Sequence, residues 1–253
     1  MERKQGAPFS ALETRFHDLV RLGSSGGRAR FMGFLDEREV LAAQRLAKGE
    51  KNGNILLWGG YSGAERAMLG VFPDFMEPDE AKFPMEAMTV SFRKCDRLSH
   101  RDFLGALVHT GIERSALGDI LVEEGRCVFF CRREISDFVL LQITKIGGTG
   151  VKMARGFDEP LPLAHHFEEW SAVIASARLD CAAAAAVSSS RGKASSMIHS
   201  GLVQLNHEVV VSPSEEVREG DMLSVRGKGR FVLDRVGPVT KKGRLMIRGR
   251  KYL

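Results

Sequence analysis

The chain has 253 residues, of which 43% are hydrophobic and 27% charged, with a formal net charge of +5. This length leaves room for two or three small domains, and the composition is ordinary for a soluble globular protein. The sequence excludes a membrane-spanning helix, because no run of about 18 apolar residues occurs, and its first residues lack the apolar stretch of a secretory signal, so we expect a cytoplasmic protein.

Residues 1–78 are predicted to form a small α/β N-terminal domain. FLDEREVLAAQRLAKG has the pattern of a helix in which Asp36 is the N-cap and Glu39 completes a capping box. NILLWGG is typical of a buried strand. SGAERAMLG is predicted to be a second helix, with Ser62 and Glu65 as its capping box.

Residues 79–165 predict a ferredoxin-like βαββαβ domain. The strand EAMTVSFR precedes a helix, SHRDFLGALVHTG, which Ser99 would cap and Gly111 would end. Two strands in DILVEEGRCVFFCR, a helix in REISDFVLLQITKIGG and a final strand in GVKMARGF follow. RNA-recognition folds share this topology with many small-molecule binders and enzymes, so the fold alone does not define a function.

Residues 171–253 predict a third domain that begins with two short helices, RLDCAAAAAV and SRGKASSMIHSG, and continues as strands. Gly201 would end the second helix, and a hairpin is expected around Asn206 and His207. The preceding segment, LPLAHHFEEWSAVIASA, is predicted to be a connecting strand or loop followed by a helix. Its adjacent His165 and His166 would point to opposite faces of a strand, which disfavours a shared metal ion.

Positive charge is concentrated in this last third of the chain. Residues 171–253 hold 14 Lys and Arg against 7 Asp and Glu, which is the asymmetry expected when one module meets phosphate. The four cysteines, Cys95, Cys127, Cys131 and Cys181, fit no zinc-ligand spacing and are expected to be free thiols. We expect neither a metal nor a cofactor.

Several separated motifs resemble the S-four RNA-binding domain, named for a small-subunit ribosomal protein. They are ARLD at 177–180, SSR at 189–191 with a lysine two residues on, IHSGLVQLN at 198–206 and EGDMLSVRG at 219–227. The resemblance implies two antiparallel helices on a small sheet, with one helix face docked on RNA. His207 stands where that family often has glycine, and histidine tolerates a left-handed turn less well than glycine does.

The position of the cations supports the same conclusion independently. Arg178 opens one helix, and Arg191 and Lys193 open the next, where the helix dipole would favour anions. We therefore predict that these cations, with free N–H groups at the helix starts, face an RNA backbone. The prediction requires that they lie together and are not neutralised by carboxylates of the same chain. The basic loop RGKGR would add a second phosphate contact. The predicted RNA-binding residues are Arg178, Ser190, Arg191, Lys193, His199, Arg226, Lys228 and Arg230.

The earlier segments extend the resemblance to nearly the whole chain. FLDEREVLAAQRLA, GGYSGAERAML and SHRDFLGALVHTGIERSALGDILVEEG are similar to the YlmH family of bacterial S-four proteins. That resemblance implies association with structured rRNA and tRNA on the large ribosomal subunit, and a part in rescue or quality control of stalled nascent-chain complexes. We expect a monomeric RNA-binding protein that has no catalytic residues.

Two other functions remain open. Pseudouridine synthases carry the same module, and ARLD raises the question of a catalytic Asp180, although its place inside the module favours local pairing. The glycine clusters in LLWGGYSGAERAML and KIGGTGVKM would allow a methyl-donor site, so an RNA-modifying enzyme is one alternative. A cell-division adaptor that uses the middle domain to bind protein is the other.

Overall fold

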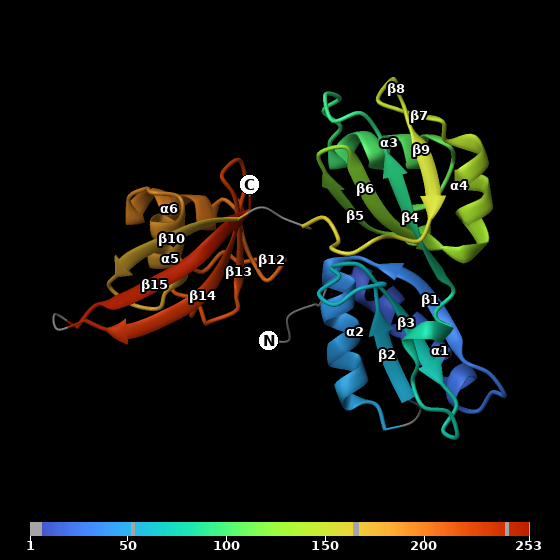
Figure 1. Cartoon of the computed structure of the whole chain (residues 1–253). Helices are drawn as coiled ribbons and strands as arrows, with labels where there is room; N and C mark the ends of the chain where they lie inside the picture. Colours follow the sequence, from blue (N-terminus) through green and yellow to red (C-terminus); the bar gives the residue numbers. More distant parts are fainter. Residues whose placement is uncertain (1–6, 52–53, 164–166, 241–242, 253) are drawn as a thin grey trace. The chain divides into compact units, whose positions relative to one another are not determined.

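The computed structural model describes residues 7–51, 54–163, 167–240 and 243–252. The chain forms two compact units, residues 1–164 and 165–253 (Figure 1). Helices and antiparallel strands are mixed in both units, which confirms the α+β class. The first unit spans both the predicted N-terminal and middle domains, so the division at residue 78 stays a prediction.

The N-terminal part of the first unit is a three-stranded antiparallel sheet with two helices. Its elements are α1 (Ala7–Ser24), β1 (Arg30–Leu35), α2 (Glu37–Gly49), β2 (Asn54–Trp58) and β3 (Ala67–Phe72), and the strand order is β1-β3-β2. The predicted capping box of α2 is confirmed. The Glu39 N–H donates to Asp36 Oδ1, and the Asp36 N–H donates to Glu39 Oε2, both at 2.9 Å.

The predicted helix in SGAERAMLG is wrong. Residues 62–66 form an irregular loop, and Ala67–Phe72 is β3, the central strand of the sheet. All six residues of β3 are buried because both faces of the sheet are covered. A strand covered on both faces shows no polar–apolar alternation, so tertiary packing overrides the helical propensity of this segment. Ser62 and Glu65 therefore form no capping box.

The middle part is a four-stranded antiparallel sheet with two helices. Its main elements are β4 (Met85–Ser91), α3 (His100–His109), β5 (Leu117–Glu123), β6 (Arg126–Arg132), α4 (Ser136–Gln142) and β9 (Lys152–Arg155). The order β5-β6-β4-β9 confirms the ferredoxin-like arrangement. The helix predicted in REISDFVLLQITKIGG is shorter than expected, because a small hairpin of β7 (Lys145–Ile146) and β8 (Thr149–Gly150) follows it. Single 3-10 turns cover Glu80–Lys82, Arg114–Ala116 and Arg133–Ile135.

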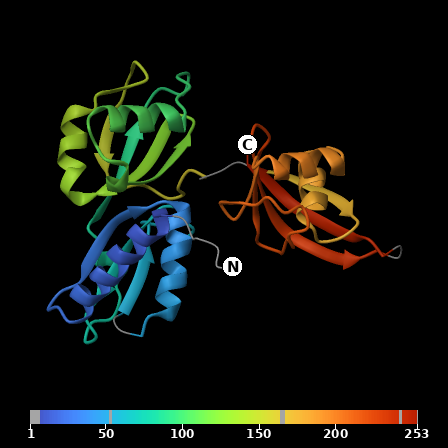
Figure 2. The same cartoon turned by 180° about the vertical axis from the view of Figure 1, so that it is seen from behind.

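The two sheets of the first unit share a hydrophobic core. Phe34, Met68 and Phe72 come from the N-terminal sheet, and Val128 and Phe130 come from β6. On the far side of each sheet, a separate core packs under its own pair of helices, α1 and α2 or α3 and α4. The view from behind shows each pair of helices beside its own sheet (Figure 2). The first unit is thus built as helices, sheet, sheet and helices.

A buried polar network crosses the junction between the two sheets. Asp119 of β5 is 8% exposed and accepts hydrogen bonds from Tyr61 Oη at 2.8 Å, Glu65 N at 2.7 Å and Arg66 N at 3.0 Å. Burial raises the pKa of Asp119 and lowers the pKa of Arg66. The Tyr61 ring stacks on Phe130 at 5.3 Å between centroids. The loop of residues 59–66 is thereby fixed against the middle sheet.

The second unit is a six-stranded antiparallel sheet with two helices. Its elements are β10 (Phe167–Ile174), α5 (Leu179–Ala186), α6 (Arg191–His199), β11 (Val203–Leu205), β12 (Glu208–Val209), β13 (Met222–Val225), β14 (Gly229–Val239) and β15 (Leu245–Tyr252). The strand order is β10-β15-β14-β13-β11-β12. The helix predicted at the end of LPLAHHFEEWSAVIASA is wrong, because Phe167–Ile174 is a strand that pairs with β15 along its whole length. His165 and His166 lie outside the described residues.

The helices of the second unit pack on one face of its sheet. Ala194 and Ile198 of α6 are buried against α5 and the sheet, as their spacing predicted. Gly201 ends α6 with a φ of +69°, and Asn206 and His207 turn the hairpin with φ values of +50° and +66°. His207 therefore adopts the left-handed conformation that glycine often supplies in the S-four family.

No helix among residues 7–51, 54–163, 167–240 and 243–252 is long and apolar enough to cross a membrane. The four cysteines are free thiols, and Cys127 and Cys131 lie in the same core, as their spacing on β6 predicted. Burial raises the pKa of Cys131 to about 12, which keeps this thiol protonated and unreactive at neutral pH.

Candidate nucleic-acid interface

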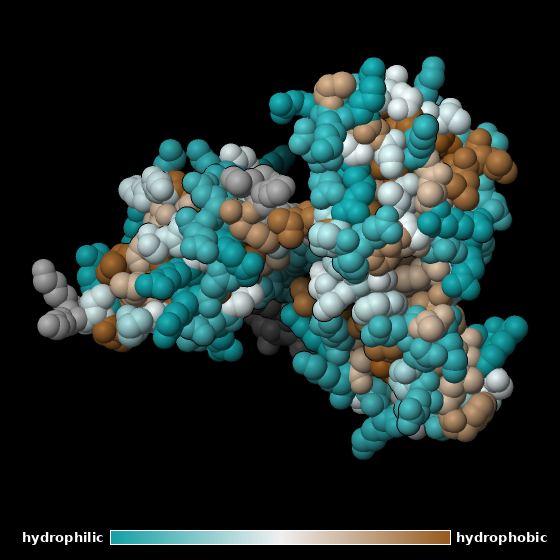
Figure 3. All heavy atoms as spheres, in the orientation of Figure 1, coloured by the Kyte–Doolittle hydropathy of each residue, from teal (hydrophilic) through white to brown (hydrophobic). Residues whose placement is uncertain are grey.

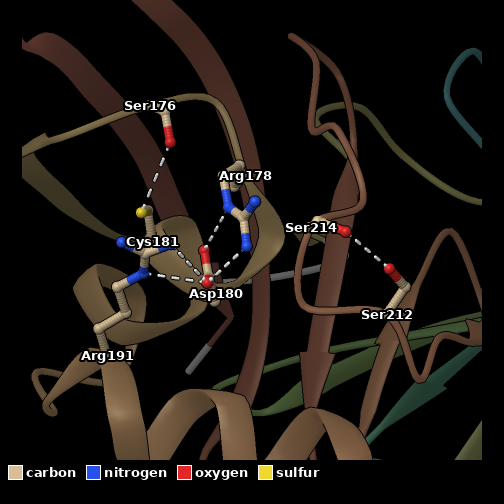
Figure 4. A network of polar contacts seen from close by, with 7 residues as sticks. All are labelled: Ser176, Arg178, Asp180, Cys181, Arg191, Ser212 and Ser214. Atoms are coloured by element: carbon tan, nitrogen blue, oxygen red, sulfur yellow. Dashed lines mark hydrogen bonds and ion pairs between the residues drawn. The ribbon is translucent and has the colours of Figure 1, made fainter.

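Two arginines of the predicted RNA-binding cluster share one carboxylate. Arg178 is the N-cap of α5 and Arg191 is the first residue of α6, and both bond Asp180 (Figure 4). Arg178 donates to Asp180 through Nε at 3.2 Å and Nη2 at 3.1 Å, and Arg191 donates through Nε at 2.9 Å. The Asp180 carboxylate is buried, whereas the arginine side chains are 39% and 54% exposed. Asp180 therefore holds two exposed guanidinium groups side by side.

The protonation of Asp180 is set by these two partners. Burial opposes ionisation of the carboxyl, but the hydrogen bonds from Arg178 and Arg191 outweigh it and lower the pKa of Asp180 to about 2. Asp180 is therefore a carboxylate at neutral pH. Its local pairing agrees with the sequence prediction, which had not identified the partners.

The requirement that the cations escape neutralisation is met only in part. Asp180 offsets one of the three positive charges of Arg178, Arg191 and Lys193, so the cluster keeps two in excess. Lys193 is exposed, and its backbone N–H donates to Ser190 Oγ at 3.3 Å. Arg178 and Arg191 therefore lie together, with a smaller net charge than their number indicates, and the placement of the Lys193 side chain beside them stays a prediction.

The start of α5 does not offer the free N–H groups that the sequence analysis assumed. The Leu179 N–H donates to the Glu215 carbonyl at 2.8 Å, and the Asp180 N–H donates to the Pro213 carbonyl at 3.1 Å. The loop before β13 thus satisfies these donors. Any phosphate bound at this end of α5 would have to be held by the Arg178 side chain.

Ser190 and His199 occupy different ends of α6. Ser190 is the N-cap, and its hydroxyl oxygen already accepts the Lys193 N–H. His199 is the last residue of α6 and is exposed, about 12 Å along the helix from Arg191 at about 1.5 Å per residue. A direct RNA contact through either residue stays a prediction.

The basic turn between β13 and β14 lies near the C-terminal end of α6. Arg226 and Lys228 are exposed, and the Arg226 N–H donates to the Leu202 carbonyl at 2.9 Å, which ties the turn to the loop after α6. A cavity of about 440 Å³ opens beside it, lined by Gly201, Gln204, Ser224, Arg226 and Arg230 among others. Hydrophilic residues cover most of the visible face of this unit (Figure 3). The predicted residues therefore form two groups, one at each end of α6.

Two family models match the chain. The model described as "Putative RNA-binding domain in YlmH" matches residues 78–156, and the model described as "S4 domain" matches residues 178–223. The first range covers the ferredoxin-like sheet. The second begins at Arg178 and includes Arg191 and Lys193, whereas Arg226, Lys228 and Arg230 lie beyond it.

Known proteins resemble the chain over most of its length. A protein of Bacillus subtilis (strain 168), named "Ribosome-associated protein quality control protein P2", is 34% identical over 217 residues, which cover 85% of this chain and 84% of that protein. A solved structure, "Cell division protein ylmH from Streptococcus pneumoniae", is 17% identical with a TM-score of 0.52. It covers 62% of this chain and 95% of its own, and it shows a shared fold.

The S4 domain at residues 178–223 and the RNA-binding domain model matched at residues 78–156 define the class, which is RNA-binding proteins with more than one RNA-binding domain. Within this class, the chain belongs to the YlmH family of S4-domain proteins.

Proposed function

We propose that this protein binds structured rRNA and tRNA on the large ribosomal subunit and acts in rescue or quality control of stalled nascent-chain complexes. The observation that carries the proposal is the pair of exposed guanidinium groups, Arg178 and Arg191, held together by Asp180. The name of the Bacillus subtilis relative supports the ribosomal setting.

The proposed mechanism is recognition of RNA shape and charge. Side chains cannot enter the deep groove of an A-form helix, so double-stranded RNA is bound mainly through phosphates and sugars. Asp180 engages Nε and Nη2 of Arg178, which leaves Nη1 outside the pair for a phosphate oxygen. Because the carboxylate fixes both guanidinium groups before binding, less side-chain entropy is lost when RNA docks.

A triple variant, Arg178→Ala, Arg191→Ala and Lys193→Ala, tests the proposal. We expect it to lose co-sedimentation with large ribosomal subunits. Because the substitutions also leave the buried Asp180 carboxylate without its arginine partners, the second unit should lose stability, and thermal unfolding of the variant is measured beside its binding. If about five phosphates are neutralised by the native protein, the logarithm of its RNA affinity should fall with log salt at a slope of about −3 to −5, and the triple variant should show a shallower slope.

The matched control is Arg21→Ala, which removes an exposed arginine from α1 in the other unit. It should leave ribosome binding and the salt slope unchanged. Unchanged co-sedimentation of the triple variant, or a flat salt response of the native protein, would show that the RNA surface lies elsewhere.

We also propose that the protein acts as a cytoplasmic monomer and by binding, without modifying RNA. The engagement of Asp180 with two arginines supports the absence of catalysis at this residue, because both oxygens of the carboxylate are already hydrogen-bonded. Mass analysis of ribosomal and transfer RNA after incubation with the protein should show no change. A new methyl group or a pseudouridine would support the enzymatic alternative.

A further inference from the structure

The sheet of the second unit has an outer face, opposite the one that α5 and α6 cover. Phe231 and Leu233 of β14 and Ile247 of β15 point into the core under the helices. Because side chains alternate along a strand, Arg230, Arg248 and their neighbours two residues away point to the outer face. Of the predicted RNA-binding residues, only Arg230 lies on this outer face. The others form the two groups at the ends of α6.

Four side chains from three strands form a row across this outer face, here called the arginine–aromatic row. Arg230 Cζ lies 4.6 Å from the centre of the Tyr252 ring, and Arg250 Cζ lies 4.8 Å from the centre of the Phe167 ring. The two rings meet edge to face, with centroids 4.9 Å apart. Phe167 and Tyr252 are direct partners across β10 and β15. The order of contacts along the row is therefore Arg230, Tyr252, Phe167 and Arg250, so that the two rings lie between the two guanidinium groups.

The row is held in place and remains accessible. Asp234 accepts from Arg250 Nε at 2.9 Å and from Nη2 at 2.7 Å, which fixes the plane of that guanidinium. The Phe167 residue is 37% exposed and the Arg250 side chain 42% exposed. A planar guanidinium stacked on a ring offers its other face for stacking, and unpaired RNA bases stack on both aromatic rings and guanidinium planes.

Two further arginines stand directly opposite each other on the same face. Arg235 and Arg248 are cross-strand partners, and a register shift between Leu233 and Arg235 turns both Asp234 and Arg235 outward. Like charges in directly opposed positions destabilise a sheet. Within the described residues, neither arginine side chain makes an ion pair or hydrogen bond. This arrangement costs stability in the free protein, and a phosphate between the two arginines would relieve the repulsion.

The outer face as a whole complements a polyanion. It carries four arginines, two from the row and the opposed pair Arg235 and Arg248, against the carboxylates of Asp234 and Glu169. From Tyr252 to Arg248 the face extends about 14 Å along β15, at about 3.4 Å per residue. Arg230 also lines the cavity beside the basic turn, so the outer face continues into the group at the end of α6.

We propose that the outer face binds unpaired nucleotides of RNA, with bases stacked on the arginine–aromatic row and phosphates at Arg235 and Arg248. The proposal rests on the proposed RNA-binding function and defines its substrate further, as structured RNA that carries a single-stranded segment next to its helix. Rings that accept any base, beside a charged track for the backbone, are the usual means of binding single strands.

The test compares three RNA probes: a blunt hairpin, the same hairpin with a single-stranded tail of about eight nucleotides, and the tail alone. We expect the full chain with Arg235→Gln and Arg248→Gln, or with Phe167→Leu, to bind the tailed hairpin and the tail at least about ten-fold more weakly. Affinity for the blunt hairpin should stay within about two-fold. Arg21→Gln, which removes another exposed charge from α1, should change no affinity.

Two further measurements separate stacking from a purely structural role of the row. Phe167→Trp keeps an aromatic ring, so it should restore binding of the tail, and its fluorescence should be quenched by the tail and not by the blunt hairpin. Thermal unfolding of each variant shows whether a loss of binding reflects unfolding. Equal losses for the blunt and tailed probes, or no loss for the tail in a folded variant, would overturn the proposal.

The design also separates this proposal from the proposed function. The Arg178, Arg191 and Lys193 triple variant should weaken both hairpins and leave the tail alone bound. If the native protein binds the tail and ignores the blunt hairpin, the proposal for the helices fails and the outer face stands. If it binds the blunt hairpin and ignores the tail, the outer face fails and the helices stand.

Discussion

At the scale of single residues, Asp180 shows how one buried carboxylate can organise a cationic surface. The sequence placed Arg178 and Arg191 at helix starts, where they oppose the helix dipole. In the structure, the carboxylate of Asp180 lies between them and offsets one of their charges. This arrangement fixes the two guanidinium groups at the cost of one unit of positive charge.

Replacing Asp180 by Asn should destabilise the second unit by about 1–3 kcal/mol at pH 7, because three charged hydrogen bonds from two arginines are weakened. The folded-state pKa of about 2 lies below the ordinary value of 3.8, so this contribution is present above about pH 4 and is lost as the pH falls through about 2. Urea denaturation at pH 7 and at low pH measures both effects.

Asp234→Asn is the control, since Asp234 pairs with Arg250 in the same unit but is far more exposed. Its removal should cost less than about 1 kcal/mol. An equal loss in the free energy of unfolding for the two substitutions would contradict the claim that burial makes the Asp180 pairs stronger than the Asp234 pair.

At the scale of elements, several features that depend on neighbouring residues were predicted correctly, although the capping box at Ser62 and Glu65 was not, and features that depend on distant packing were missed. The capping box of α2 and the glycine at the end of α6 depend on residues within four positions, so the sequence alone predicted them. The strand β3 was predicted as a helix, because its burial depends on a second sheet that begins at Met85. The arginine–aromatic row was missed for the same reason, since Phe167 and Tyr252 meet only through the register of β10 and β15.

The junction network offers a test at this scale. Tyr61→Phe keeps the ring that stacks on Phe130 and removes one of the three donors to buried Asp119. We expect a loss of about 1 kcal/mol in the free energy of unfolding of the first unit, because two backbone donors remain. Ser115→Ala removes a hydroxyl bonded to exposed Glu113 and should cost less than about 0.5 kcal/mol. Chemical denaturation compares the two, and equal values would show that the network adds nothing.

At the scale of the whole molecule, the sequence predicts three domains, whereas the chain forms two compact units. The N-terminal and middle sheets share the core formed around Phe34, Phe72 and Phe130. The second unit has a core of its own, under α5 and α6. The matched families and the fold class could be predicted from sequence motifs, whereas the fusion of the first two sheets depends on aromatic residues with no local signature.

Fragments of the chain test this organisation. Residues 1–164 should unfold in one cooperative transition, and residues 165–253 should fold separately. Residues 1–78 alone should aggregate or remain unfolded, because Phe34, Met68 and Phe72 would lose their cover. Calorimetry and light scattering of the three fragments provide the measurement. A soluble, cooperatively folded fragment 1–78 would contradict the shared core.

The pairing of β10 with β15 has a further consequence for engineering. It sets Phe167 directly opposite Tyr252, so the start of β10 and the end of β15 lie beside each other at the same end of two neighbouring strands. A short glycine linker can join these ends, and new termini can be opened at the exposed turn of residues 226–228 without cutting a strand. The unit is therefore suited to circular permutation and to insertion, as a portable cassette, into a surface loop of an unrelated host.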